Sequence, residues 1–247
     1  WPCGASVSSR STSASMTGTG MRSLATLLFL SGLVFLLLVL TASLPFGRPP
    51  MLVGDAIAQA AANEVGAANF VTAVVLGYRG LDTLGELSIL FAAATAGGLV
   101  LGASRGATHR RPAGFILRAG ADVLFPLLLI VGLYIVMHGH LTPGGGFQGG
   151  AIIASGMLLM LLSHPLRRFG HRMIAIVESI AGMAFVFIGV LGIALAGGFL
   201  DNRILPIGAL GELFSAGAIP IIYTFVGLKV GAEFSSMLLN LSETEEL

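Results

Sequence analysis

Ionisable side chains cluster in the segment YRGLDTLGE, which spans residues 78–86. Arg79, Asp82 and Glu86 are spaced at i, i+3 and i+7, so a continuous helix would place them on one face. Carboxylates four residues apart perturb each other's protonation, and a neighbouring arginine tunes their affinity for a cation. A path for protons or sodium ions needs such groups. The alternative is a structural Arg79–Asp82 pair, with Glu86 capping the helix or facing water.

A second polar segment, HGHLTPGGGFQGG, covers residues 138–150. Proline followed by three glycines favours a tight non-helical link. At membrane depth such backbone persists only when it is buried in protein or lines water. His138 and His140 could shuttle protons near neutral pH, but for the histidines alone we favour a sharp turn at headgroup level. No third ligand lies nearby, so we expect no metal site.

Other ionisable residues interrupt the apolar stretches of the chain. Asp122 follows Arg118 at i+4, which permits a helical ion pair. Glu178 stands alone near the start of a later apolar run, and Glu212 lies within the last one. Such residues are costly in lipid, so we expect them to face the bundle, a partner subunit or a hydrated ion path.

Lys229 is the only lysine, and Glu233 follows it at i+4 in the last apolar run. A desolvated lysine has a lowered pKa, which suits a proton relay. The alternative, which we favour, is that Lys229 reaches the interface from the helix end or pairs with Glu233.

Composition identifies lipid as the main solvent of these residues. Hydrophobic residues make up 55% and charged residues 10% of the 247 positions, and the mean hydropathy is +0.92. This composition excludes a soluble catalytic domain. A net charge of +1 gives no argument for nucleic acid. With a single cysteine, Cys3, and no nucleotide or hydrolase motif, we expect no cofactor, and any electron carrier would sit in a partner.

The apolar runs predict an all-α, polytopic bundle of about six membrane helices with short loops. In the last run, we expect residues 213–228 to lie at lipid depth. Asp55 to Tyr78 is expected to form one amphipathic interface helix. A cleaved signal peptide is the alternative for the first run, although signal segments are usually shorter. The runs cover residues 24–44, 87–103, 119–137, 147–163, 174–196 and 210–239.

Three segments are expected along the chain. Residues 1–20 are small and polar, which predicts a disordered tail, and Met21 is a plausible natural start. Residues 21–106 would form a first membrane block with the interface helix and the acidic cluster. Residues 107–247 would form a four-helix block.

Arginine placement predicts the orientation in the membrane. Arg105, Arg110 and Arg111 fill one loop, and Arg167, Arg168 and Arg172 fill another two spans later. The turn between these spans has no lysine or arginine. With six spans, both termini lie in the cytoplasm, in a prokaryotic cell membrane.

Two segments resemble a known family of membrane complexes. HGHLTPGGGFQGG is similar to the GH-x-x-PGGGF signature of the MnhB-type component of multisubunit Na+/H+ antiporters of the Mrp or Mnh type. YRGLDTLGE resembles the FRG-x-DT-x-GE block at the C-terminal end of the largest component of these antiporters. In related membrane-bound hydrogenases this block forms a small separate subunit. Here the two blocks are fused, and the last segment looks more like the hydrogenase-type version.

The resemblance implies a subunit that joins antiporter-like pumping subunits, other small subunits and lipid, with Arg79, Asp82, Thr83 and Glu86 as candidates for the H+ or Na+ path. Asp82 and Glu86 would take up and release the ion, and Arg79 would keep their affinity in range. One alternative is a non-conducting adaptor that aligns and seals the pumping subunits. A self-sufficient transporter is disfavoured, because the chain shows no clear inverted repeat.

Overall fold

The computed structural model describes residues 13–43, 52–102, 113–164 and 170–243. Within these ranges every regular element is helical, and six helices, α1 and α4 to α8, are long and apolar enough to cross a membrane. The prediction of an all-α bundle of about six membrane helices is therefore confirmed. The elements are α1 (Ser13–Ser43), α2 (Leu52–Glu64), α3 (Phe70–Thr72), the π-helix η1 (Ala73–Tyr78), α4 (Gly80–Gly102), α5 (Phe115–Met137), α6 (Gly146–Ser163), α7 (His171–Ala196), the 3-10 helix η2 (Asn202–Ile204) and α8 (Ile219–Glu243).

The chain divides into two compact units, residues 1–52 and 53–247. In the first unit, the side chains of α1 from Ser23 to Ser43 are all exposed. Residues 13–20, expected in a disordered tail, belong to this helix. Extending an existing helix orders only one residue for each backbone hydrogen bond gained, whereas starting a new helix orders several. The helix of the first apolar run can therefore continue back into residues 13–20. Residues 1–12 of the expected tail lie outside the described residues.

The segment expected to form one amphipathic helix from Asp55 to Tyr78 is broken in the middle. Gly66 has a φ of +73°, a left-handed conformation that glycine adopts without steric cost. A Cβ atom at this position would lie 2.1 Å from Cγ2 of Ile207. After the break, Asn69 caps the next helical segment with its side chain. The single-helix prediction was wrong because this glycine turn and cap begin a new helix.

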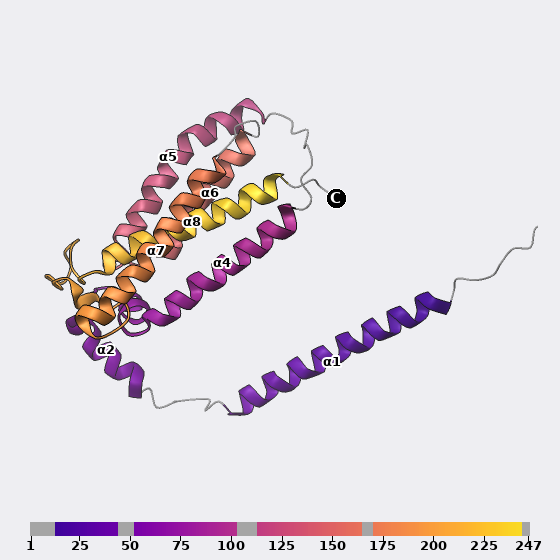
Figure 1. The fold of residues 1–247 in the computed structure, drawn as a ribbon, viewed down its shortest axis with the longest axis horizontal. Coiled ribbons are helices and arrows are strands. Elements are labelled where there is room, and N and C mark those ends of the chain that lie inside the picture. Colours follow the sequence, from indigo (N-terminus) through magenta and orange to yellow (C-terminus); the bar gives the residue numbers. More distant parts are fainter. Residues whose placement is uncertain (1–12, 44–51, 103–112, 165–169, 244–247) are drawn as a thin grey trace, which may run out of the picture. The chain divides into compact units, whose positions relative to one another are not determined.

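In the second unit, α8 is the central helix and packs against α4, α5, α6 and α7 (Figure 1). Glycines allow the closest approaches. A Cβ atom on Gly149 of α6 would lie 2.6 Å from the carbonyl oxygen of Gly132 in α5. One on Gly150 would lie 2.8 Å from the carbonyl oxygen of Gly227 in α8. Small residues thus set the spacing of the bundle, as is usual for membrane helices.

Two helix starts differ from the sequence prediction. The last helix begins at Ile219, not near residue 210, and α4 begins at Gly80, not at residue 87. Gly217 has a φ of +59°, and a Cβ atom there would lie 2.1 Å from the carbonyl oxygen of Asn202. The predicted lipid-level stretch 213–228 was therefore wrong, since its first six residues belong to the loop before α8.

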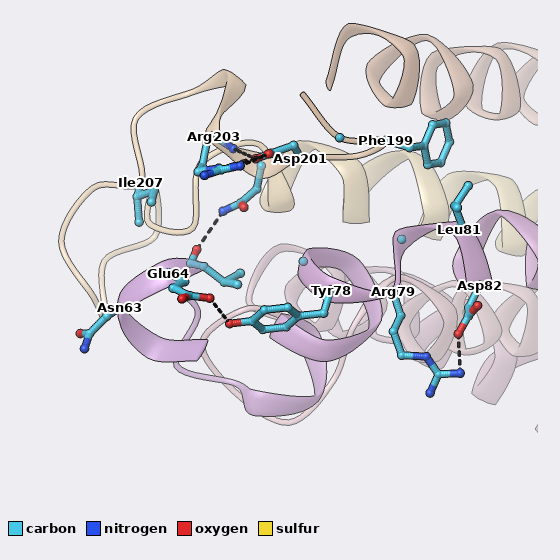
Figure 2. A pocket seen from close by; sticks show the side chains of 15 residues that line it. Asn63, Glu64, Tyr78, Arg79, Leu81, Asp82, Phe199, Asp201, Arg203 and Ile207 are labelled. Carbon is cyan, nitrogen blue, oxygen red and sulfur yellow. Dashed lines mark hydrogen bonds and ion pairs between the residues drawn. The ribbon is translucent and has the colours of Figure 1, made fainter. Parts of the chain in front are cut away.

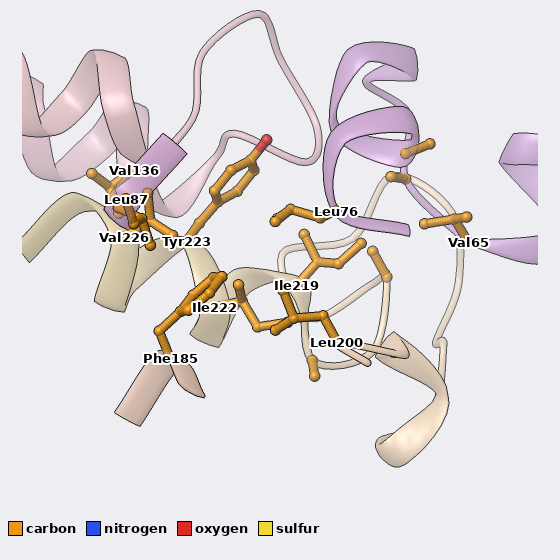
Figure 3. Close-up of a cluster of buried hydrophobic side chains, with 14 of the residues drawn as sticks. Val65, Leu76, Leu87, Val136, Phe185, Leu200, Ile219, Ile222, Tyr223 and Val226 are labelled. Atoms are coloured by element: carbon orange, nitrogen blue, oxygen red, sulfur yellow. The ribbon is translucent and has the colours of Figure 1, made fainter. Parts of the chain in front are cut away.

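The buried core lies where η1, the loop after α7 and the first turns of α8 meet (Figure 3). Leu76, Leu200, Ile219 and Ile222 are fully buried there. The cluster joins residues from both sides of the boundary expected near residue 106. The segment 53–102 therefore packs as part of the same compact unit as the helices that follow.

Candidate functional site

The acidic cluster of residues 78–86 spans a helix break. Arg79 ends η1 with φ −125° and ψ 36°, whereas Asp82 and Glu86 lie on α4. The three charged residues are therefore not on one continuous helix, contrary to the prediction from their spacing. The side chains of Arg79 and Asp82 still pair, with Nη2 and Oδ2 2.5 Å apart, and both are largely exposed. The structural pair that the sequence left as an alternative is thus present.

Thr83 and Glu86 occupy different surroundings on α4. Thr83 is buried, and its hydroxyl donates to the carbonyl oxygen of Val75 at 2.8 Å. It thereby ties the π-helix to α4 and satisfies a carbonyl near the helix break. Glu86 is exposed, and among the described residues it forms no ion pair. It lies close enough to Tyr223 of α8 to interact with it electrostatically.

A polar pocket of about 880 Å³ opens between the start of α4 and the loop after α7 (Figure 2). Its charged groups are paired locally: Arg79 with Asp82, and Arg203 with Asp201. The hydroxyl of Tyr78 donates to Glu64 at 2.5 Å. The pocket is lined by Asn63, Glu64, Val65, Gly77, Tyr78, Arg79, Gly80, Leu81, Asp82, Gly198, Phe199, Asp201, Asn202, Arg203 and Ile207.

The contacts of Tyr78, Asp201 and Arg203 shift the pKa values of these three side chains. The hydrogen bond to Glu64, with smaller contributions from burial and the Glu64 charge, raises the pKa of Tyr78 to about 12. The hydrogen bond from Arg203 lowers the pKa of Asp201, and Asp201 in turn raises the pKa of Arg203. Tyr78 therefore stays neutral, and Asp201 and Arg203 stay charged, near neutral pH.

A largely buried ionisable triad consists of Glu178 on α7 and Lys229 and Glu233 on α8. Nζ of Lys229 lies 2.5 Å from Oε1 of Glu233 and 3.9 Å from Oε1 of Glu178. Glu233 is fully buried, and its Oε2 has no hydrogen-bond partner in the described part of the chain. The ring of Phe91 on α4 lies 5.0 Å from Nζ, within cation–π range.

A mostly apolar groove of about 370 Å³ between α4 and α7 exposes part of this triad. Glu178 and Lys229 contribute its charged lining, and their side chains keep 18% and 11% of their exposure. Lys229 follows the first residue of α8 by ten positions, which places it about 15 Å along the helix, near the middle of a bilayer. The groove is lined by Leu84, Leu87, Ser88, Phe91, Glu178, Ser179, Gly182, Phe185, Val186 and Lys229.

The histidine segment forms a compact link between α5 and α6. His138 stacks on Tyr134, with ring centroids 4.1 Å apart. His140 is fully buried, and neither ring nitrogen has a hydrogen-bond partner among the described residues. Its backbone carbonyl accepts from the amide of Asn69 at 2.9 Å. The two histidines therefore occupy different environments, one against a tyrosine and one inside the protein.

Burial lowers the pKa of the His140 imidazole, and the charge of His138 acts in the same direction. The backbone of Glu212 and Leu213 opposes the shift in part, without hydrogen bonds of normal geometry to the ring. His140 is therefore neutral near neutral pH.

Hydrogen bonds fix this link to the neighbouring elements. The hydroxyl of Thr72 donates to the carbonyl oxygen of Gly139 at 2.6 Å and lies 2.8 Å from the hydroxyl of Tyr223. The side chain of Asn69 donates to the carbonyl oxygens of Gly139 and Thr142. These contacts of Thr72, Asn69 and Tyr223 were not predictable from the sequence, because a lone polar residue in an apolar run gives no signal of its partner.

Two remaining candidates lie away from the triad. Asp122 is exposed, and Oδ1 lies 3.6 Å from Nε2 of His164. Within the described ranges, that histidine replaces the expected Arg118 as its ion-pair partner. Glu212 is exposed in the loop before α8, so its expected position in the last membrane helix was wrong.

Comparison with known proteins identifies the family. Residues 116–236 match a domain described as related to the MnhB subunit of the Na+/H+ antiporter. An uncharacterized protein of Methanocaldococcus jannaschii is 31% identical over 200 residues, covering 68% of this chain and 74% of that protein. This chain belongs to the MnhB-related family. A putative MnhB2 antiporter subunit of Staphylococcus haemolyticus is 33% identical over 84 residues, 30% of this chain and 60% of the relative.

Solved structures extend the similarity beyond the MnhB-related domain. A chain of the membrane-bound sulfane sulfur reductase, an archaeal respiratory membrane complex, is 40% identical, with a TM-score of 0.76. The alignment covers 92% of this chain and all of that one. A chain of the Mrp complex from Dietzia sp. is 25% identical with a TM-score of 0.69, covering 96% of this chain and 27% of that one. The resemblance drawn from the two sequence motifs is confirmed.

The MnhB-related domain contains the buried triad but not the acidic cluster. Glu178, Lys229 and Glu233 all lie within residues 116–236, whereas residues 78–86 precede that range. Arg79 and Asp82 of the cluster and Glu178 and Lys229 of the triad nevertheless line two pockets that share helix α4.

Proposed function

We propose that this chain is a membrane subunit of a multisubunit Na+/H+ antiporter or of an antiporter-like energy-converting complex, and that it contributes to H+ or Na+ translocation. The names of its relatives support both kinds of complex. One relative is a putative antiporter subunit, and another belongs to a respiratory membrane complex. Its partners would be antiporter-like pumping subunits and other small membrane subunits. Where a redox reaction drives the complex, the electron carriers would belong to those partners.

Glu86 carries this proposal. It is an exposed carboxylate two turns into a membrane helix, and among the described residues no cation pairs with it. An ionised carboxylate facing hydrocarbon is costly, so Glu86 must meet water, a partner subunit or a bound cation. A site for exchange of H+ or Na+ at the interface with a pumping subunit satisfies that requirement, with Asp82 and Arg79 at its entrance.

The experiment is ion transport by the whole complex in membrane vesicles, comparing wild type with Glu86→Gln and Asp82→Asn. We expect Glu86→Gln to lower transport by at least roughly tenfold, because a neutral amide cannot exchange a proton. Asp55→Asn, an exposed change on α2 outside the membrane helices, is the matched control. Assembly is checked by native gel. Intact complexes that transport normally with both Glu86→Gln and Asp82→Asn would remove this cluster from the ion path.

A second candidate function is that of a non-conducting adaptor. The Arg79–Asp82 pair favours it, because a carboxylate already neutralised by arginine is a poor exchange site. In this case Asp82→Asn would reduce the amount of assembled complex on the native gel. Transport per assembled complex would stay constant, which distinguishes the adaptor from a conducting subunit.

We also propose that the chain lies in a prokaryotic cell membrane with both termini in the cytoplasm. The support is the arginine distribution, although Arg105, Arg110, Arg111, Arg167 and Arg168 lie outside the described residues.

A further inference from the structure

We propose that Glu178, Lys229 and Glu233 form a binding site for one proton at mid-membrane depth. The inference deepens the proposed function, since translocation by the complex would use the proton that this site holds. Binding of the proton by the triad can be tested separately from transport.

The charges of the triad do not balance when every group is ionised. Two carboxylates and one ammonium leave one net negative charge when all three are ionised. Glu233 is fully buried and its Oε2 has no partner among the described residues, whereas a buried carboxylate oxygen normally accepts a hydrogen bond. An uncompensated charge in this setting is far more costly than a neutral acid. One carboxyl group therefore holds a proton.

The surroundings of the triad offer no other charge in the described part of the chain. Ser88 and Phe91 of α4 and Ser179 of α7 are neutral neighbours in the groove. On the α6 side, Gly150 and Ile153 pack against Gly231 of α8.

The next titratable groups toward the start of α8 are Glu86 and Tyr223. Tyr223 precedes Lys229 by six residues, or about 9 Å along the helix. Compensation within the triad must therefore come from a proton on Glu178 or Glu233.

Lys229 is placed to change partners when the proton moves. Its ammonium contacts Glu233 at 2.5 Å and lies 3.9 Å from Glu178. In the state with ionised Glu233, the proton resides on Glu178. When Glu178 releases that proton and Glu233 takes one up, the ammonium shifts to the Glu178 carboxylate. Lys229 keeps all three of its protons, so each cycle exchanges one proton with the surroundings.

Gly182 on α7 gives the lysine side chain room beside Glu178. A Cβ atom at this position would lie 3.2 Å from Cδ and 3.3 Å from Cε of Lys229. These contacts are tighter than usual, so alanine would press the lysine chain away from α7. The glycine thus leaves space on the side to which the ammonium must move.

The groove between α4 and α7 provides access to the site. Glu178 and Lys229 are among its lining residues, and the polar pocket lies toward the start of the same α4 helix. Leu81 lines the polar pocket and Leu84 lines the groove, one helical turn apart. Water in the groove would carry protons between the polar pocket and the triad. A sodium ion at this position would contact the Lys229 ammonium, a like charge, which favours the proton as the ligand.

The test is infrared difference spectroscopy of the purified complex during a pH titration, reading the carbonyl stretch of protonated carboxylic acids. We expect the triad to contribute one such buried group in the wild type. Glu178→Gln and Glu233→Gln should each remove it, because the remaining lysine–carboxylate pair is already neutral. Lys229→Met should raise the signal to two groups, because both acids then need protons. Asp55→Asn, on exposed α2, should leave the signal unchanged.

Each outcome decides the proposal. A wild-type signal that persists in both glutamine variants, or no buried acid at any pH, would overturn it. Loss of the signal on adding Na+ at constant pH would assign the site to sodium instead. If Lys229→Met fails to assemble, the two glutamine variants still decide. Glu86→Gln, measured for both vesicle transport and the infrared signal, separates the two proposals, since this variant can lose transport while the triad signal stays intact.

Discussion

At the scale of single residues, the two histidines of the link after α5 differ most from one another. His138 stacks on Tyr134 at the helix end, while His140 is buried without a hydrogen-bond partner for its ring among the described residues. The sequence could not tell them apart, because they are two positions apart in the same motif. The backbone of Glu212 and Leu213, in the loop before α8, approaches His140 from far along the chain, and the local sequence does not encode that approach.

His140 should make the folded protein sensitive to acid. Its pKa is lowered below the ordinary value of 6.5 by burial, so the unfolded chain takes up the proton first. Its contribution to stability is therefore complete above pH 6.5 and is lost as the pH falls toward the folded-state pKa. We expect thermal unfolding of the purified protein in detergent to shift to lower temperature between about pH 7 and about pH 5.

Replacing the ring tests this assignment. His140→Phe should flatten the pH dependence, while His138→Phe, which keeps the stack on Tyr134, should preserve it. Equal slopes for the wild type and His140→Phe would mean that other groups cause the acid sensitivity.

At the scale of elements, membrane helices were predictable because length and lack of charge define them almost alone. Their starts were less predictable, since Gly66 and Gly217 have positive φ values at positions where Ile207 and Asn202 leave no room for a Cβ atom, which is a matter of tertiary packing. For the triad, too, the local contact was predictable and the long-range contact was not. The spacing of Lys229 and Glu233 predicted their pairing, but the approach of Glu178 depends on how α7 packs against α8, which no local pattern encodes.

Glycines at helix crossings should tolerate substitution poorly. We expect Gly149→Ala and Gly150→Ala to lower stability by about 1–3 kcal/mol each, because a Cβ atom would press on the neighbouring backbone. Gly97→Ala on α4 is the matched control: it meets nothing within 4 Å and should be neutral or slightly stabilising. Thermal unfolding in detergent measures all three. Similar losses at Gly97 and Gly149 would point to helix distortion instead of packing.

At the scale of the whole molecule, the loops of residues 53–247 gather at two ends of the bundle. Asn202 donates to the carbonyl oxygens of Val65 and Ala216, and Asn69 donates to the link after α5. These bonds hold the loops before α4, α6 and α8 at the same end. The end of α6 and the start of α7 then lie at the other.

Labelling of single cysteines in intact cells would test the proposed orientation. On a Cys3→Ser background, Ala209→Cys in the loop before α8 should react with a membrane-impermeant thiol reagent added outside. Gly170→Cys, before α7, should react only after the membrane is opened. The reverse pattern would place the termini outside the cytoplasm.

The central position of α8 has a consequence for how the protein is made. Among the helices that the structure describes, α8 is the last in chain order, yet α4, α5, α6 and α7 all pack against it. During synthesis these four helices enter the membrane before the helix that they surround. Until α8 inserts, Glu178 lies in the bilayer without the ammonium group of Lys229. A carboxyl group is tolerated there in its protonated form, because a lone carboxylate in lipid is costly. Packing of the four helices around α8 and ion pairing within the triad are therefore expected to occur together, late in biogenesis, after α8 has been synthesised and inserted.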